Sequence, residues 1–272
     1  MKEIIKRSIT GLIYIFLIVV SALLGKEALH TVFVFFGMVC LYEVQKLLHY
    51  KSVMSYLLLL GLILLNLTTS IIQDYFIFLV PVFLIVAVIL ITNLFSNKKS
   101  STNVNKHLVI NFYIIPAFVL LPNLPDFSKH NTDVSQPEPL ILIGFFLLVW
   151  CNDSFAYVFG KNFGKNKLFE RISPKKTIEG FLGGAIMCIF SGFLFFKFTQ
   201  VLDLTTWIGM AVLVSIFGTL GDLVQSKFKR IAQVKDSGSI IPGHGGIFDR
   251  MDSTIFSITF VYAFLIILSY VS

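Results

Sequence analysis

The strongest constraint on this chain is a series of apolar segments, each about as long as a helix that crosses a bilayer. The hydrocarbon core offers no water to exposed backbone groups, so such segments must be helical. Only 14% of the 272 residues are charged and 56% are hydrophobic, which excludes an ordinary soluble domain and a disordered chain. We therefore predict an all-α, polytopic integral membrane protein with about nine transmembrane helices, near 9–25, 29–45, 53–69, 75–95, 108–122, 140–159, 180–198, 206–224 and 254–271.

The distribution of basic residues predicts the orientation of these helices. With the N-terminus in the cytoplasm, nine spans leave the loops near 46–52, 96–107, 160–179 and 225–253 on the same side. Together with the N-terminus these loops carry 19 of the 22 Lys and Arg residues, as the positive-inside rule expects. We expect a multi-pass protein of the inner (cytoplasmic) membrane, with its C-terminus on the opposite side. The net charge of +7 then reflects topology and anionic lipid, and no nucleic acid partner is expected.

Four prolines between Pro122 and Pro139 indicate an external loop that divides the chain. We predict an N-terminal membrane part over 1–122 with about five spans, the loop over 123–139, and a C-terminal catalytic part over 140–272 with about four spans. The basic N-terminus followed by an apolar run also fits a signal peptide, but without a convincing cleavage site before Lys26 a retained span is favoured.

Acidic residues inside or beside the apolar segments are the first candidates for function, because burying a charge in a membrane is costly. Asp153 lies in the sixth segment and Asp222 near the end of the eighth. Asp249 and Asp252 are at the entrance of the ninth, where their i, i+3 spacing places them on one face of its helix. The predicted topology brings all four to the cytoplasmic face. The alternative is that each carboxylate simply pairs with a nearby Lys or Arg at the interface.

The loop over 160–179 carries a second group of candidates, in the stretch Ser173-Pro-Lys-Lys-Thr-Ile-Glu-Gly180. Thr177 is predicted to cap the seventh transmembrane helix, and Gly183 and Gly184 would let a helix or a ligand approach its backbone. A basic loop that only sets topology and contacts anionic headgroups is the alternative interpretation.

The densest polar stretch runs from Ser226 to Asp252. If the eighth helix continues beyond the membrane, Asp222, Gln225 or Ser226, and Lys229 or Arg230 share one of its faces. Glycines around His244 allow left-handed turns whose N–H groups point at an anion. Carboxylates, bases and a glycine turn suit a complex of Mg²⁺ with a polyphosphate, although the phosphate loop of soluble nucleotide hydrolases is missing. For His244 we favour direct contact with ligand over a role as general base.

This stretch resembles the signature of the phosphatidate cytidylyltransferases (CDP-diacylglycerol synthases). The fixed positions of that signature are all filled here, by Ser226, Lys229, Arg230, Lys235, Asp236, Gly238, Pro242, His244, Gly245, Gly246, Asp249, Arg250 and Asp252. Trp150-x-x-Asp-Ser-x-Ala-Tyr157 and the stretch over 173–180 resemble two further family motifs, with Ile178 where Trp is common. The N-terminal five spans match the family only in hydropathy and length.

The resemblance implies an enzyme that joins CTP and phosphatidate to give CDP-diacylglycerol and pyrophosphate, with a cytoplasmic site, one or two Mg²⁺ ions and a homodimeric assembly. We expect Asp222 and Asp249 to bind the metal, with Asp153, Asp236 and Asp252 as weaker candidates. The expected catalytic set is Asp222, which lies just before the signature, together with the signature residues Lys229, Arg230, Lys235, Asp236, His244, Asp249 and Arg250. The expected substrate-binding residues are Ser173, Lys175, Lys176, Thr177, Ser226, Gly243, Gly245 and Gly246.

Three other functions are compatible with parts of the sequence. Asp153 and Asp222 would also suit an ion-coupled carrier, although the chain shows no internal repeat. A lipid kinase, or a nucleotidyltransferase acting on another lipid, would use similar groups. A structural membrane protein with basic loops explains the polar residues in the spans least well.

Overall fold

The computed structural model describes residues 2–68, 72–96, 105–130, 138–238, 240 and 245–271. The first four helices are α1 (Lys2–Leu24), α2 (Lys26–Leu47), α3 (Val53–Thr68) and α4 (Ile72–Phe95). They are followed by one composite helix, made of α5 (Lys106–Val109), η1 (Ile110–Ile114), α6 (Ile115–Leu120) and η2 (Leu121–His130). The rest is α7 (Pro139–Phe163), β1 (Lys167–Phe169), β2 (Ser173–Thr177), α8 (Ile178–Thr199), the composite α9 (Leu204–Leu213), η3 (Val214–Gly218) and α10 (Thr219–Ile231), and α11 (Phe248–Val271).

The helices confirm the prediction of an all-α, multi-pass membrane protein. Within the described residues, seven helices are long and apolar enough to cross a bilayer, and the apolar stretches Ile9–Leu24 and Val53–Thr68 are shorter. Each of the nine predicted segments thus corresponds to a helix or composite helix. Large apolar side chains such as those of Phe16 and Phe198 are exposed on the outside of the bundle, where lipid would cover them.

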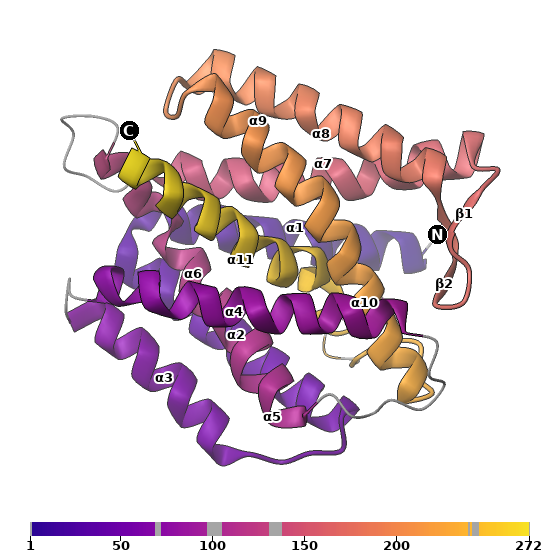
Figure 1. Cartoon of the computed structure of the whole chain (residues 1–272), viewed down its shortest axis with the longest axis horizontal. Helices are drawn as coiled ribbons and strands as arrows, with labels where there is room; N and C mark the ends of the chain where they lie inside the picture. The colour runs from indigo at the N-terminus through magenta and orange to yellow at the C-terminus, as the bar shows by residue number, and fades with distance from the viewer. Residues whose placement is uncertain are drawn as a thin grey trace.

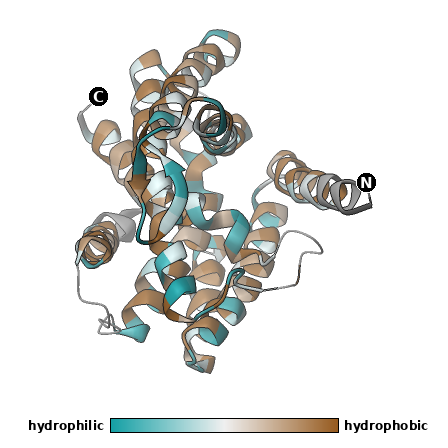
Figure 2. Ribbon diagram, turned by 90° about the vertical axis from the view of Figure 1, so that its right-hand side faces the viewer, coloured by the Kyte–Doolittle hydropathy of each residue, from teal (hydrophilic) through white to brown (hydrophobic). Residues whose placement is uncertain are grey.

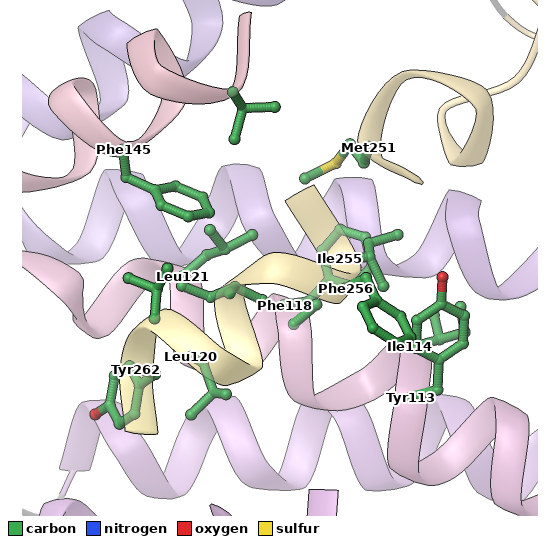
Figure 3. Packing of buried hydrophobic residues seen from close by; sticks show 14 of the residues in the cluster. Tyr113, Ile114, Phe118, Leu120, Leu121, Phe145, Met251, Ile255, Phe256 and Tyr262 are labelled. Carbon is green, nitrogen blue, oxygen red and sulfur yellow. The ribbon is translucent and has the colours of Figure 1, made fainter. Parts of the chain in front are cut away.

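The fifth apolar segment forms the centre of the bundle. Pro116 cannot donate a hydrogen bond to the preceding turn, and the helix widens into the π-helical η1 just before it. Helix α11 packs along this composite helix, and Figure 3 shows its Phe256 beside Tyr113, whose rings lie 5.8 Å apart. The last helix of the chain is therefore held by residues of the N-terminal part.

Helices α7 and α8 approach each other through small residues. A Cβ atom at Gly184 would lie 2.8 Å from the carbonyl oxygen of Asn152 and 2.9 Å from Cβ of Ala156, so only glycine permits this approach. The structure thus shows that a helix, and not a ligand, occupies the space left by this glycine. The close pairing fixes the end of α7 against the start of α8.

The loop between α7 and α8 contains a two-stranded antiparallel hairpin, which was not predicted from the sequence. Lys167 pairs with Thr177, and Phe169 pairs with Ser173. The predicted cap is confirmed, because the Thr177 hydroxyl accepts a hydrogen bond of 3.2 Å from the Gly180 N–H. Figure 1 shows the hairpin beyond the ends of α7 and α8, and Figure 2 looks onto this end of the bundle.

Two predicted boundaries differ from the structure. Helix α11 begins at Phe248, six residues before the predicted start of the ninth segment, so Asp249, Arg250 and Asp252 belong to its first turns. The predicted external loop begins as the helix η2, and residues 131–137 lie outside the described residues. The N- and C-termini lie at opposite ends of the bundle (Figure 1). Which of these ends faces the cytoplasm stays a prediction.

Candidate active site

A cavity of about 590 Å³ opens at the hairpin end of the bundle. Its walls come from the last turns of α7, the hairpin, the start of α8, α10, the segment after α10 and the first turns of α11. Segments that are distant in the sequence therefore meet at this cavity. The predicted site residues that line it are Asp153, Lys175, Lys176, Thr177, Asp222, Lys229, Asp236, Asp249, Arg250 and Asp252.

Asp222 stands on α10 and faces the hairpin. Its Oδ2 atom lies 2.6 Å from Nζ of Lys176, and its Oδ1 atom accepts a hydrogen bond of 3.2 Å from the Ser226 hydroxyl, one helical turn further on. The side chain is 31% exposed, so this carboxylate is accessible from the cavity. The sequence predicts that Asp222, Ser226 and Lys229 share one face of the helix. This hydrogen bond confirms the prediction for Asp222 and Ser226.

Asp249 stands on the first turn of α11 and is almost completely enclosed. Its Oδ1 atom lies 2.9 Å from Nζ of Lys229 and 3.4 Å from Nε2 of Gln225. Its Oδ2 atom accepts hydrogen bonds from the backbone N–H and the hydroxyl of Ser237, at 2.7 and 2.9 Å, and from the Gly246 N–H at 3.0 Å. With these five hydrogen bonds, Asp249 ties α10, α11 and the segment between them together.

Asp153 and Asp252 face the cavity from α7 and α11. The Asp153 carboxylate accepts hydrogen bonds of 3.4 Å from Asn152 and Ser253, and the Asp252 carboxylate accepts one of 2.8 Å from the Ser253 N–H. Asp153, Asp222 and Asp252 line the same cavity, and their ionised forms would repel one another. A site that gathers three carboxylates in this way is stabilised by a cation.

The donor set of the cavity fits a hard divalent ion. All its acidic groups are carboxylates, and Mg²⁺ commonly takes one or two carboxylates and completes its shell with water and phosphate oxygens. Among the described residues, no three His, Cys, Asp or Glu side chains form a metal-binding group by themselves. Asp222 offers an oxygen that only the Lys176 ammonium now occupies, whereas Asp249 would have to release Lys229 or a backbone donor.

The glycine turn is partly described. Gly245 has a φ of 83°, in the left-handed region that the sequence predicted for this turn, and a Cβ atom there would lie 2.7 Å from Oδ2 of Asp249. The Gly246 N–H points at the same carboxylate and not into the cavity. Gly243 and His244, both expected to contact ligand, lie outside the described residues.

Six of the predicted residues that the structure describes do not line the cavity: Ser173, Ser226, Arg230, Lys235, Gly245 and Gly246. Arg230 turns away from it, and its Nε atom lies 3.5 Å from the carbonyl oxygen of Ile172 in the hairpin turn. Ser173 lies at the far end of β2 from the cavity, and Lys235 is exposed on the segment after α10. Helical spacing places Lys229 and Arg230 next to each other, but only Lys229 faces Asp249.

Glu43 on α2 was not predicted as a site residue. It is a buried acid whose carboxylate accepts hydrogen bonds from the segment that carries Asp249. Tyr157, which was named only as a motif position, and Lys161 also line the cavity, from α7. Glu43 had a detectable signal, because it is a carboxylate inside the second apolar segment. The rule that selected Asp153 and Asp222 applies to it equally.

The fold and the cavity define a multi-pass membrane protein with a charged site at one end of its helices. Over residues 5–268 the chain matches the model of the cytidylyltransferase family. The chain therefore belongs to the cytidylyltransferase family.

Individual relatives match over a shorter region. The chain is 49% identical over 123 residues to the phosphatidate cytidylyltransferase of Staphylococcus aureus (strain COL) and 50% identical to that of Staphylococcus haemolyticus (strain JCSC1435). Each alignment covers 44% of this chain and 47% of the relative, so the chain spans about half the length of the curated relatives it matches.

Proposed function

We propose that this protein is a CTP:phosphatidate cytidylyltransferase, which makes CDP-diacylglycerol and pyrophosphate for phospholipid biosynthesis. The family match and the names of the staphylococcal relatives support this activity. The observation that carries the proposal is the cavity at the hairpin end, where carboxylates from three helices face lysines from the hairpin and α10. A site at the end of a membrane bundle accepts a lipid headgroup from the bilayer and a nucleotide from water.

The proposed reaction is a single displacement at phosphorus. An oxygen of the phosphatidate phosphate forms a bond to the α-phosphorus of CTP, and the bond from this phosphorus to the bridging β-phosphate oxygen breaks, so that pyrophosphate leaves with the electron pair. Phosphate is already an anionic nucleophile at neutral pH, and the reaction therefore requires no general base. The work of the protein is to position two polyanions and to neutralise their charge.

The basic residues of the cavity suit this task. Lys161, Lys175, Lys176, Lys229 and Arg250 approach it from four elements, and five cations surrounding one volume reduce the repulsion between a triphosphate and a phosphate. We assign Lys175 and Lys176 to the phosphatidate headgroup or the leaving pyrophosphate. We assign Lys229 and Arg250 to the triphosphate.

We further propose that Mg²⁺ is the cofactor, held by Asp222 and Asp249 with help from Asp153, Asp236 and Asp252. When bound, the ion would neutralise phosphate charge and align the two substrates. Asp222 and the neighbouring Asp153 and Asp252 are the readiest ligands, because Asp249 is already saturated with hydrogen bonds. Binding a cation at Asp222 would free Lys176 to contact phosphate.

The proposed cellular setting follows from the same site. CTP is a cytoplasmic nucleotide, so the hairpin end and the N-terminus face the cytoplasm and the C-terminus faces the other side. The bacterial relatives support the cell membrane as the location. A homodimer stays part of the proposal on the strength of the family resemblance.

Asp222→Asn in the detergent-purified protein tests the proposal. We expect the variant to melt within about 2 °C of the parent, because Asp222 is partly exposed, and to lose at least about 100-fold in CDP-diacylglycerol formed from CTP, phosphatidate and Mg²⁺. Asp203→Asn is the matched control, because it makes the same change at the cap of α9, and Asn is also a good cap. Near-normal turnover by Asp222→Asn would refute the assignment of Asp222.

The choice of acceptor separates the related activities. Labelled CTP is offered with phosphatidate, an ether-linked phosphatidate or polyprenol, and the lipid fraction is analysed for label and for released pyrophosphate. We expect label in the phosphatidate product. Label with polyprenol alone would indicate another lipid substrate, and no label in any lipid would favour a carrier.

A further inference from the structure

The buried acid Glu43 links the N-terminal helices to the segment that carries the candidate site. It lies on α2, close to the end of that helix, and is 1% exposed. Its Oε2 atom accepts a hydrogen bond of 2.9 Å from the Phe248 N–H, and its Oε1 atom accepts one of 3.2 Å from the Ile247 N–H. Both oxygens of a side chain in the second apolar segment are thus used by residues about 200 positions later in the chain.

These two N–H groups are at the start of α11. The first N–H groups of a helix have no partner within the helix, and a Ser, Thr, Asp or Asn just before it usually accepts from one of them. Here the preceding residues are Gly246 and Ile247, whose side chains have no acceptor. Glu43 therefore takes the place of a cap and sets where α11 begins. The turn that it holds carries Asp249, Arg250 and Asp252.

A second contact extends this link to the segment after α10. The Ser237 hydroxyl lies 3.3 Å from Oε2 of Glu43 and 2.9 Å from Oδ2 of Asp249, so it stands between the two carboxylates. A Cβ atom at Gly238 or Gly246 would overlap the Glu43 carboxylate. The requirement for glycine at these two signature positions is therefore explained by the close approach of Glu43.

We propose that Glu43 is a positioning residue for cytidylyl transfer, which holds the first turn of α11 and the Ser237–Gly238 segment so that Asp249, Arg250 and Asp252 face the cavity. It lines no part of the cavity itself, so it acts through these residues. Small displacements of groups that align two substrates cost large factors in rate. The catalytic part of this inference rests on the proposed function, whereas the structural part does not.

The test is Glu43→Gln in the full-length protein. Glutamine keeps the size of the side chain but replaces one oxygen with an NH₂ group, which would face a backbone N–H with donor against donor. Glu43→Asp keeps both acceptors on a shorter side chain. Gln45→Ala is the matched control on the same helix, because Gln45 is also buried but bonds to the backbone of Ser52, at 3.0 Å for its Nε2 donor and 2.8 Å for its Oε1 acceptor.

Hydrogen exchange is the measurement that does not depend on activity. In Glu43→Gln we expect the amides of Ile247 and Phe248 to exchange at least about 10-fold faster, with α8 unchanged, and in Glu43→Asp an intermediate increase. In Gln45→Ala these two amides should exchange at the parental rate. Unchanged exchange at both amides in Glu43→Gln, or an equal increase along the whole chain, would overturn the proposal.

Turnover then tests the catalytic part. We expect Glu43→Gln to lower kcat at saturating CTP by about 10- to 100-fold, Glu43→Asp to recover part of this loss, and Gln45→Ala to stay within about twofold of the parent. Parental kcat in Glu43→Gln, or an equal loss in Gln45→Ala, would overturn the role of Glu43 in positioning. If the parent itself forms no CDP-diacylglycerol, the proposed function fails, and the exchange experiment still decides whether Glu43 holds α11.

Discussion

The two lysine–aspartate pairs of the cavity differ in how much else surrounds them. Lys176 and Asp222, between the hairpin and α10, are 25% and 31% exposed and share few further partners. Lys229 and Asp249, between α10 and α11, are 13% and 5% exposed, and the aspartate accepts four additional hydrogen bonds. Both pairs line the cavity, but the first is more accessible to a ligand, and the second also holds α10, α11 and the segment between them together.

The difference indicates that two pairs of the same chemistry contribute differently to the stability of the fold. An exposed pair contributes little to stability, so its partners can exchange for a ligand at small cost. A buried pair costs several kcal/mol when one partner is removed, because the other charge is left without compensation. We therefore expect variants at the Asp222 pair to affect mainly activity, and variants at the Asp249 pair to affect activity and folding together.

Asp249→Asn should have the largest effect of the variants that test this comparison. The amide cannot compensate Lys229 and turns a donor toward groups that are themselves donors. We expect a loss of about 3 kcal/mol in unfolding free energy and no measurable turnover. Thermal melting in detergent and CDP-diacylglycerol formation measure the two effects. A variant that melts like the parent would remove the distinction between the pairs.

Replacing the lysines should separate the pairs more finely. Lys229→Met leaves the Asp249 charge enclosed, and we expect it to lose about 2–3 kcal/mol of stability as well as activity. Lys176→Met should cost less than about 1 kcal/mol, because Asp222 remains solvated, while turnover falls about 10-fold. The test compares the melting temperatures of Lys229→Met and Lys176→Met. Equal shifts from the parent would contradict the distinction between the two pairs.

Ser226→Ala should have the smallest effect. It removes the 3.2 Å hydrogen bond to Asp222 but leaves the Lys176 pair in place. A neutral-to-charged hydrogen bond of this kind contributes about 1 kcal/mol, which corresponds to about fivefold in kcat/KM. Steady-state kinetics with CTP as the varied substrate give this number. A loss as large as that of Asp222→Asn would mean that Ser226 contacts substrate directly.

The sequence predicts the helices well, because apolar length and the absence of water in a bilayer leave the backbone few choices. It also predicts the Thr177 cap, since the cap depends on residues three positions apart. The hairpin was missed because Lys167–Thr177 is a basic, Pro-containing stretch without an alternating apolar pattern. The position of Asp249 and Asp252 on the last helix was predicted, but its first residue was not, because its cap comes from another helix.

For the site, the sequence predicts that its acidic residues meet at one end of the molecule, as the cavity confirms, but it does not predict their individual contacts. Lys229 and Arg230 are neighbours of the same charge, and only packing decides that one meets Asp249 and the other the carbonyl of Ile172. Asp222 and Asp249 look equivalent as predicted metal ligands. Their difference in enclosure depends on Ser237 and Gly246, whose backbone N–H groups carry no sequence signal.

The cap that Glu43 provides for α11 also bears on how the protein is made. Chains emerge from the ribosome N-terminus first, so α2 enters the bilayer before the signature segment is synthesised. When α11 enters the membrane, the Glu43 carboxylate that accepts its first N–H groups is already there. The start of α11 at the hairpin end of the bundle therefore depends on an early helix, and truncations that remove α2 should leave the last span without a defined starting point.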